Sequence, residues 1–377
     1  IGLEVIVVDH HEAEVNHPEC VALINPKRHD ESQNYDYLAA VGVTFILCVA
    51  LNRTLRQKNY FNEIIKEPDL KQLLDLVALG TVCDVVPLKG LNRAFVVQGL
   101  KVMAGRRNAG LTALADIAGI QEAPEAYHAG YILGPRVNAG GRVGEASMGT
   151  MLLTTDNPAF AQDLAAKLDR YNAERKDLEQ QVLDEAILMV EKSTFKNIVV
   201  ACGQGWHPGV IGIVASRLKE RYGLPSLVIS VNEGVGHGSG RSISGVDLGS
   251  AIIAARQSGH LVKGGGHAMA AGFTVEEGKI KSFQSFLEDR ISLEIEEKQL
   301  TPTYKFDGSM PLGSLTPALV EELEAVGPYG AGNAQPRFVV ESLFVKRSDI
   351  VGKDHVRCFL GNDLGMNLKA IAFRALD

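Results

Sequence analysis

Asp9, His10 and His11 are the first residues whose types and spacing could do chemistry, in the sequence EVIVVDHHEAE (residues 4–14). They follow an apolar run of β-forming residues, and open α/β sheets bind ligands at the carboxyl ends of their strands. Imidazole suits Mn, Fe, Co or Zn, and carboxylate suits Mg or Mn, so this mixed set predicts a transition metal such as Mn. A capping aspartate beside two surface histidines is an equally good interpretation of the tripeptide alone.

Asp84 is a second candidate ligand. It lies in GTVCDVVP (residues 80–87), just past a predicted helix and in otherwise apolar surroundings. An unpaired carboxylate is costly to remove from water, so Asp84 should be matched by a cation or by hydrogen-bond donors. The structural alternative is that Asp84 caps the turn that follows.

Four further segments combine glycine with groups that bind phosphate. Glycine lets backbone amides approach a phosphate closely, and Arg or Lys supplies the charge. Several such segments together predict a track for a phosphodiester backbone, although glycines 264–266 would also suit tight helix–sheet packing. The segments are a flexible run 134–147 with Arg136, Asn138 and Arg142; a helix start 206–212 with His207; 236–245 with Ser239, Arg241 and Ser242; and 263–272, before a small-residue helix, with Lys263, Gly264, Gly265, Gly266 and His267.

The first half of the chain predicts the elements that position Asp9 and Asp84. Residues 3–9 form a continuous apolar run, typical of a parallel strand covered on both faces. A long helix with a buried, apolar first half is expected over 39–57. Over 69–88, helical spacing should end at a Gly80 stop before the turn that carries Asp84.

The second half predicts a connector and a second α/β unit. Residues 157–193 are polar, and Asn157-Pro158 is typical of a helix start; we favour a connector between domains over one or two solvated helices. Strands at 197–203 and 225–230 flank an amphipathic helix over 209–223, which makes a βαβ unit. Short strands after about residue 300 predict a small all-β module. Strands that alternate with helices make the chain an α/β protein.

Composition limits the function classes. A chain of 377 residues should form two or three domains, and a net charge of -7 argues against a protein that coats a polyanion by bulk charge. Five scattered cysteines suit a reducing cytoplasm and exclude a thiolate zinc site or a disulfide framework. No apolar run is long enough for a bilayer span, and no signal peptide is visible, so we expect no membrane association.

The motifs, in their order along the chain, resemble those of the DHH/DHHA1 phosphoesterase superfamily and, within it, its bacterial single-stranded-DNA exonucleases. They are VVDHHE, LLDLVALGTVCDVVPL, LGPRVNAGGR, WHPGVIGIVASRLKERY, GSGRSI, KGGGHAMAAGFTV and VGPYGAGNAQPRF. DHH alone would be weak, but the ordered set spans almost the whole chain and is highly specific. The resemblance implies a partial, parallel-sheet DHH domain (1–155), a long connecting helix (156–194), an α/β DHHA1 domain (195–298) and a C-terminal β-barrel of oligonucleotide-binding (OB) type (299–377).

The resemblance also implies an activity and its residues. The expected reaction is 5′→3′ hydrolysis of single-stranded DNA by a two-metal mechanism with Mn²⁺ or Mg²⁺, in DNA repair and recombination. His10 and Asp84 would be metal ligands, His11 would contact the scissile phosphate, and Asp9 and Arg142 would belong to the catalytic set. The residues expected to bind DNA or phosphate are Arg136, Asn138, His207, Ser239, Arg241, Ser242, Lys263, Gly264, Gly265, Gly266 and His267. Bases could stack on Tyr304, Phe306, Tyr329 or Phe338, unless these aromatic residues are core.

Superfamily members carry an Asp-x-Asp motif and another Asp before the DHH strand, whereas this sequence starts at Ile1, almost on that strand. We therefore expect that preceding sequence is missing, and that this chain is a fragment that binds metal weakly and cleaves little or nothing. The alternatives are a phosphodiesterase for oligonucleotides or cyclic dinucleotides, and a non-catalytic single-strand-binding protein. We expect a cytoplasmic monomer whose partners are single-stranded DNA and, alongside it, a single-strand-binding protein and a helicase.

Overall fold

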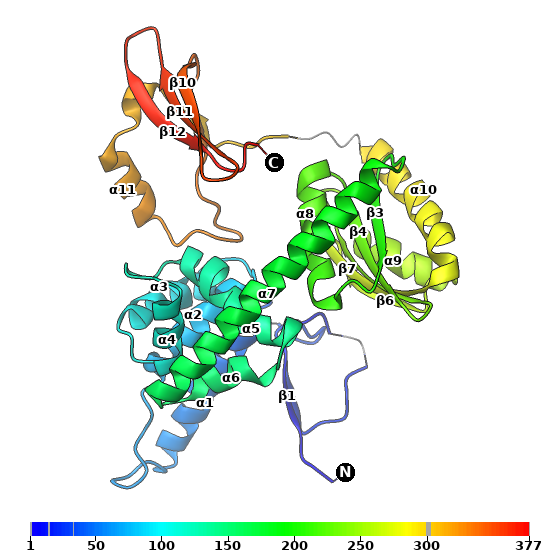
Figure 1. Ribbon diagram of the computed structural model, residues 1–377. Helices are drawn as coiled ribbons and strands as arrows, with labels where there is room; N and C mark the ends of the chain where they lie inside the picture. Colours follow the sequence, from blue (N-terminus) through cyan, green and yellow to red (C-terminus); the bar gives the residue numbers. More distant parts are fainter. Residues whose placement is uncertain (1, 14–15, 33, 299–302, 377) are drawn as a thin grey trace. The chain divides into compact units, whose positions relative to one another are not determined.

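The computed structural model of the chain describes residues 2–13, 16–32, 34–298 and 303–376 and is mixed α/β, as predicted (Figure 1). Packing divides the chain into two compact units. The first comprises Ile1–Gly105, Ala123–Gly130 and Tyr304–Asp377, and the second comprises Arg106–Glu122 and Tyr131–Thr303. The predicted domain limits stay predictions, and the one at 298/299 borders residues 299–302, which lie outside the described part. No helix of the described residues has the length and apolar character needed to cross a bilayer.

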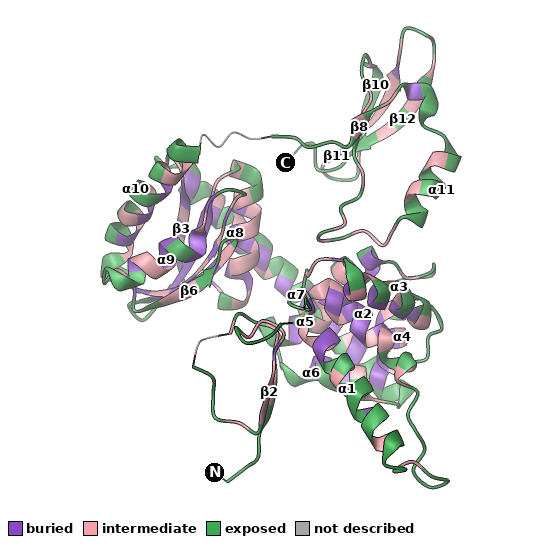
Figure 2. Ribbon diagram, turned by 180° about the vertical axis from the view of Figure 1, so that it is seen from behind, coloured by how far each residue is buried: buried purple, intermediate pink, exposed green. Residues whose placement is uncertain are grey.

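In the first unit, the apolar run before Asp9 forms only a short strand. β1 (Ile6–Val8) pairs in parallel with β2 (Ala22–Ile24). The prediction of a strand covered on both faces is wrong, since Leu3 and Ile6 are 76% and 60% exposed. Figure 2 shows exposed and intermediate residues, not buried ones, along this pair. An apolar run favours extended backbone, but burial depends on the elements packed over it, and few described residues cover this strand.

Three helices form the core of the first unit. The contacts between α2 and α3 are close, because a Cβ atom at Gly99 would lie 2.0 Å from the carbonyl oxygen of Leu74. The buried apolar residues are Leu38, Val43, Val77 and Phe95. The elements are α1 (Ala40–Gln57), the 3₁₀ turn η1 (Leu70–Leu73), α2 (Leu74–Cys83) and α3 (Gly90–Ala104).

Two details of these helices differ from expectation. α2 does not stop at Gly80 but continues to Cys83, with Asp84 as its C-cap. A Cβ at Gly80 would lie 2.8 Å from Cγ1 of Val41, so this glycine serves close helix packing and not helix termination. The apolar first half of α1 is only half-buried, since Ile46 is 41% exposed.

The C-terminal part of the first unit is a small β-rich module. The prediction that it is all-β is wrong, because it also contains a helix, Pro317–Ala325. β10, β11 and β12 form an antiparallel sheet, and β8 pairs in parallel with β9. Among the described residues these strands form two separate small sheets. Their bounds, with the helical segments between them, are β8 (Gly308–Ser309), η4 (Leu312–Ser314), α11 (Pro317–Ala325), β9 (Phe338–Val339), β10 (Phe344–Val351), β11 (His355–Gly361) and β12 (Asn367–Ala372).

The second unit is organised around one long helix, α7 (Pro158–Glu191), which confirms the predicted helical tract. The Asn157 side chain caps it by accepting hydrogen bonds from the amides of Ala159 and Phe160. α7 packs on α4, α5 and α6 along one part of its length and on α8 and β3 along another. The shorter helices are α4 (Ala109–Ile117), α5 (Gly134–Val143) and α6 (Ser147–Thr154). The π-helical turn η2 (His128–Leu133) precedes α5, and only its residues from Tyr131 onward belong to the second unit.

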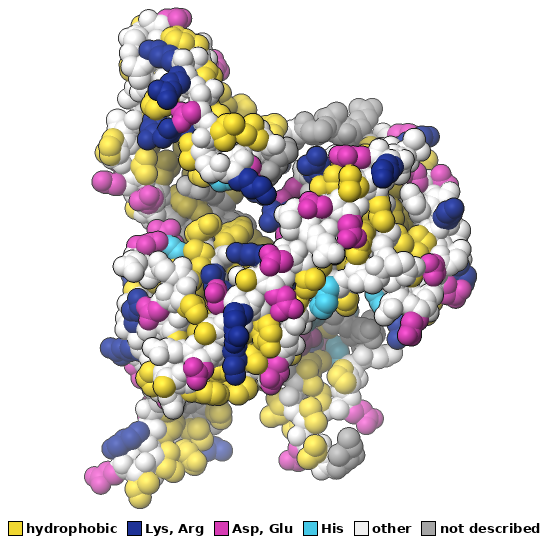
Figure 3. Space-filling model, viewed as in Figure 1, with side chains coloured by type: hydrophobic (Ala, Val, Ile, Leu, Met, Phe, Trp, Pro, Cys, Tyr) yellow, Lys and Arg dark blue, Asp and Glu magenta, His cyan; other side chains and the backbone are white. Residues whose placement is uncertain are grey.

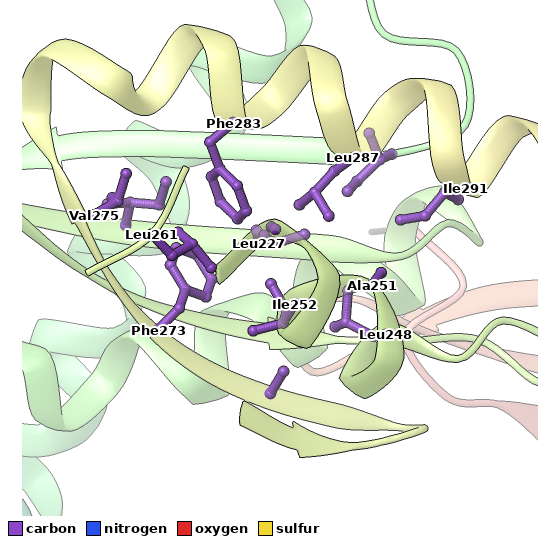
Figure 4. Close-up of a cluster of buried hydrophobic side chains, with 14 of the residues drawn as sticks. Leu227, Leu248, Ala251, Ile252, Leu261, Phe273, Val275, Phe283, Leu287 and Ile291 are labelled. Carbon is purple, nitrogen blue, oxygen red and sulfur yellow. The ribbon is translucent and has the colours of Figure 1, made fainter. Parts of the chain in front are cut away.

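A five-stranded sheet of order β3-β4-β5-β7-β6 forms the rest of the second unit. β3 and β4 are parallel around α8, which confirms the βαβ unit, and α8 ends at Gly223 in the left-handed conformation (φ 65°). α8 covers one face, and α9 and α10 cover the other with Ile252, Phe283 and Leu287 (Figures 1 and 4). The bounds are β3 (Val199–Gln204), α8 (Pro208–Tyr222), β4 (Ser226–Asn232), β5 (Val235–Arg241), α9 (Leu248–Gln257), β6 (Lys263–His267), β7 (Ala270–Glu276), η3 (Glu277–Lys279) and α10 (Ile280–Lys298).

Three glycine-rich segments that were expected to be loops are regular elements. The run 134–147 is mostly α5, 236–245 begins in β5, and 263–272 is the hairpin of β6 and β7, with a strand where a small-residue helix was expected. Packing explains the glycines of β5. A Cβ at Gly238 would lie 2.1 Å from the ring of Phe273, and one at Gly240 would lie 2.7 Å from Leu248.

Candidate active site and nucleic-acid interface

The first unit places Asp9 and His11 in a tight local arrangement after β1. Asp9 Oδ1 accepts hydrogen bonds from the backbone amide of His10 at 2.8 Å and from Nδ1 of His11 at 2.7 Å. The hydrogen bond from His11, above all, lowers the pKa of Asp9. Because a carboxylate only accepts, the imidazole carries its proton on Nδ1 and presents Nε2 outward. Asp9 therefore caps the turn and orients His11, which is exposed.

His10 and Asp84 converge although they come from different elements. His10 Nε2 lies 3.4 Å from Asp84 Oδ2, and the His10 side chain is 13% exposed against 37% for Asp84. His10 follows strand β1, and Asp84 is the C-cap residue of helix α2. The two side chains are thus close enough to bind one cation together, with an imidazole nitrogen and a carboxylate oxygen that suit Mn²⁺. The described residues contain no cluster of three or more His, Cys, Asp or Glu suited to a metal, so water or phosphate oxygens would fill the other positions.

The second unit brings together two arginines from distant parts of the sequence. Arg142, at the end of α5, donates from Nη1 to the carbonyl oxygen of Gly209 in the first turn of α8 at 3.0 Å. Partial burial and the like charge of Arg175 lower the pKa of Arg142, and burial and Arg142 lower the pKa of Arg241. Arginine stays protonated in proteins, so the pair concentrates positive charge. Two neighbouring guanidinium groups favour an anion such as phosphate.

The strand register puts five of the eleven predicted DNA- or phosphate-binding residues on one face of the sheet. Residues paired across antiparallel strands share a face, and so do alternate residues along a strand. The register therefore gives three rows across β5, β7 and β6: His237–Thr274–Lys263, Ser239–Gly272–Gly265 and Arg241–Ala270–His267. We call this face the glycine strip, because two of the three residues in its middle row are glycines.

The glycine strip is open where its middle row lies. A Cβ atom at Gly265 or at Gly272 would meet no atom within 4 Å. α8 borders the strip, since a Cβ at Gly212 would lie 3.0 Å from Ser239 Oγ. His207 is the N-cap of α8, and its Nδ1 accepts a hydrogen bond from the amide of Gly209 at 3.1 Å. Bare backbone beside cationic side chains and a helix N-terminus can accept a phosphodiester backbone at close range.

Other predicted residues lie apart from these groups. Arg136 is held by Asp169 Oδ1 at 2.8 Å, and Asn138 is exposed on α5. Ser242 is fully buried and donates to the carbonyl oxygen of Val246 at 2.8 Å. Gly264 and Gly266 point to the opposite side of β6 from Gly265, where a Cβ at Gly264 would lie 2.8 Å from Ile252 and one at Gly266 would lie 2.3 Å from the Ala270 carbonyl.

The C-terminal module carries a cationic and aromatic surface that the sequence reasoning missed. The Arg347 and Arg357 guanidinium groups each lie 5.9 Å from the ring centre of Phe359, and Lys369 pairs with Phe359 across the strands. Lys and Arg side chains gather over this sheet in Figure 3. The signal was the spacing of Arg357 and Phe359, since residues two apart on a strand lie on one face. Of the aromatic residues named from sequence, Tyr304 is 92%, Phe306 57% and Phe338 37% exposed; Tyr329 donates to the Leu323 carbonyl.

Family models match three parts of the chain: the DHH family, N-terminal domain (residues 1–81), the DHHA1 domain (195–293) and the RecJ OB domain (306–377). A curated relative, the single-stranded-DNA-specific exonuclease RecJ of Salmonella typhimurium, is 37% identical over 368 residues, which cover 95% of this chain and 64% of the relative. RecJ of Haemophilus influenzae is 34% identical, with 99% of this chain and 67% of the relative covered. The chain thus spans about two thirds of the length of these relatives.

Solved structures of RecJ proteins also match this chain. The crystal structure of RecJ in complex with Mn²⁺ from Thermus thermophilus has a TM-score of 0.82 and 29% identity, and covers 100% of this chain and 53% of that one. A crystal structure of exonuclease RecJ bound to manganese has a TM-score of 0.61 and 32% identity, and covers 78% of this chain and 70% of that one. Together with the family models and the relatives, these matches show that the chain belongs to the RecJ family of DHH/DHHA1 phosphoesterases.

Proposed function

We propose that the protein is a 5′→3′ exonuclease that hydrolyses phosphodiester bonds of single-stranded DNA with Mn²⁺ or Mg²⁺. The approach of His10 Nε2 to Asp84 Oδ2, 3.4 Å, carries the proposal, because it joins two metal-binding groups from separate elements. The names of the relatives and the glycine strip support the substrate class. We expect an active RecJ-family exonuclease to hold two ions, as the resemblance implies.

The donor set fits a divalent cation but supplies few ligands. A bound Mn²⁺ or Mg²⁺ would provide a hydroxide nucleophile at neutral pH and would neutralise charge that develops on the phosphate. His10 and Asp84 would hold it, and the two ligands they provide favour weak binding by this chain. We therefore propose that the 377-residue chain has little or no nuclease activity.

The protein's own side chains would position the DNA and stabilise charge. His11, which Asp9 orients through its Nδ1–H, would contact the scissile phosphate. Arg142 and Arg241 would hold the phosphate of the 5′ end with charge-assisted hydrogen bonds. The glycine strip would bind the backbone that follows, with Ser239 as a hydroxyl donor.

The C-terminal sheet would extend the binding of single-stranded DNA. A base can stack on Phe359 while Arg347 and Lys369 attract the phosphates, whereas Arg357 is ion-paired with Asp349. Base stacking on an aromatic side chain contributes about 1–3 kcal/mol. Unpaired bases are available only in single strands, which favours single-stranded over duplex DNA. Phe359→Ala should therefore weaken binding of a long single strand about five-fold or more and leave binding of a dinucleotide unchanged.

We also infer the setting in which the protein works. An exonuclease for single strands needs a strand already separated, which a helicase and a single-strand-binding protein would supply during DNA repair and recombination. All five cysteines lie among the described residues and are free thiols, as suits the cytoplasm. We expect the protein to act as a monomer.

One set of assays separates the proposal from its alternatives. The chain is incubated with Mn²⁺ and with 5′-phosphorylated single strands, duplexes or dinucleotides, and both binding and product formation are measured. We expect single strands to bind best, Arg241→Gln to weaken that binding, and slow cleavage, if any is detected, to be lost in Asp84→Asn. Faster turnover of dinucleotides than of long strands would instead support a small-substrate phosphodiesterase. Tight binding without cleavage, even when a longer chain is used, would support a single-strand-binding protein.

A further inference from the structure

The motif VGPYGAGN (residues 326–333) lies against the segment that follows Asp84. The backbone amide of Leu88 donates to the carbonyl oxygen of Ala331 at 2.7 Å. Arg93, on α3, donates from Nη2 to the carbonyl oxygens of Val326 and Gly327, the latter at 3.1 Å. The loop therefore contacts the helical part of the first unit through its own backbone carbonyl groups, which fix position more than side-chain identity.

Two glycines make this contact close. A Cβ atom at Gly330 would lie 2.8 Å from Leu88 Cδ1. A Cβ atom at Gly332 would lie 2.8 Å from Pro87 Cβ, and Gly332 also has the left-handed backbone conformation (φ 68°). Any other residue at either position would push the loop away from Pro87 and Leu88.

The turn between Asp84 and Leu88 is strained. Val85 has φ 58°, a conformation that β-branched residues rarely adopt, and its side chain is 69% exposed, so little packing holds it. Strained backbone persists only where the surrounding structure fixes it. Here the far end of the turn is fixed, since the Asn92 side chain donates to the Pro87 carbonyl at 3.0 Å and Leu88 is bonded to the loop.

We propose that residues 326–333 are a brace that holds the strained 84–88 turn and so positions Asp84 toward His10. The proposal rests on the proposed function, in which Asp84 is a metal ligand. In this arrangement the C-terminal module contributes to the metal site without supplying a ligand. Removal of the brace would let Val85 relax to an ordinary conformation and turn the Asp84 carboxylate away from His10.

The test uses the 377-residue chain with two independent changes, Gly332→Ala and Arg93→Ala. Hydrogen exchange at the Leu88 amide and the Mn²⁺ dissociation constant, from electron paramagnetic resonance, are measured for each. We expect the exchange to be at least ten-fold faster and Mn²⁺ binding to be about five-fold weaker. Arg93→Lys, which can still donate to the Val326 carbonyl, should restore part of both losses.

Matched controls make the outcome decisive. Gly365→Ala creates the same backbone strain in the same module (φ 79°) but meets no atom within 4 Å, so it should change neither readout. Val85→Asn, which tolerates the left-handed conformation, should reduce the effect of Gly332→Ala. If Asp84→Asn abolishes Mn²⁺ binding while Gly332→Ala and Arg93→Ala leave it unchanged, the brace is overturned and the metal role of Asp84 stands. If Asp84→Asn has no effect on Mn²⁺ binding, both fail.

Discussion

The long helix α7 carries a buried charged cluster close to Arg142. The substitution Glu179→Gln tests how much this cluster contributes to the stability of the fold. Glu179 accepts hydrogen bonds from Arg175 Nη1 at 2.6 Å and from Arg217 Nε, on α8, at 3.4 Å. Arg175 also donates to Asn172 Oδ1 at 3.2 Å, and Glu179 and Arg175 are each 8% exposed. The substitution keeps an acceptor at this position but removes the only carboxylate bonded to Arg175 among the described residues.

The expected magnitude follows from this burial. Removing one partner of a buried ion pair costs about 3–5 kcal/mol, because the other charge stays buried without compensation. Glutamine retains one neutral hydrogen bond to Arg175, which contributes about 1 kcal/mol. The pair with Arg217 adds little, since that side chain is 41% exposed. Glu179→Gln should therefore lower the free energy of unfolding of the second unit by about 2–4 kcal/mol.

Urea unfolding followed by tryptophan fluorescence measures this loss directly. The single tryptophan, Trp206, is 5% exposed, and its Nε1 donates to Glu185 of α7 at 2.7 Å, so its emission reports on the second unit. Glu174→Gln, an exposed acid on the same helix, is the matched control and should change stability by less than about 0.5 kcal/mol. A loss below about 1 kcal/mol for Glu179→Gln would refute the reasoning, since it would mean that Arg175 is hydrated in the folded state.

A double variant and a binding measurement separate the effects of the Arg175 and Glu179 charges from the effects of their packing. Arg175→Met combined with Glu179→Leu removes both charges and should be neutral or stabilising by about 1–4 kcal/mol. Glu179 also raises the pKa of the nearby Arg142, though less than burial and Arg175 lower it. Losing this carboxylate makes the surroundings of Arg142 more positive. Single-stranded DNA should therefore bind the folded Glu179→Gln variant at least as tightly as the unaltered protein.

Three further predictions concern single groups. Gly265→Ala should keep the fold but weaken binding of single-stranded DNA in fluorescence anisotropy, whereas Gly266→Ala should lower the melting temperature because its Cβ would meet the backbone at 2.3 Å. Burial raises the pKa of Cys83 to about 11. At pH 8 the alkylation of Cys83 in the native chain should therefore be about a hundred-fold slower than in urea. Peptide mass spectrometry can measure both rates. Burial also raises the pKa of Asp75, so this group opposes folding as the pH rises through that pKa. Asp75→Asn should gain stability relative to the unaltered chain as the pH rises from the ordinary Asp pKa of 3.8 through the raised pKa of the folded state, and a relative loss in thermal unfolding would contradict this.

The convergence of His10 and Asp84 was predictable because each belongs to a short motif at the end of a regular element. The secondary structure of the glycine-rich segments was not predictable. Glycine favours loops locally, but the glycines of β5 are required by Phe273 and Leu248, which lie far along the chain. The exposed face of β1 was unpredictable for the same kind of reason, since an apolar run says nothing of which elements cover it.

The roles of glycines 264–266 can be told apart once these residues are known to form a strand. From sequence, glycines 264–266 are equally suited to tight packing and to phosphate binding. Once β6 is a strand, period-two alternation assigns the two roles to different residues, since Gly264 and Gly266 face one side and Gly265 the other. The first and third glycines meet Ile252 and the β7 backbone, whereas Gly265 meets no atom within 4 Å. A methyl group at position 265 is therefore compatible with the fold and occupies space that a bound phosphodiester would need.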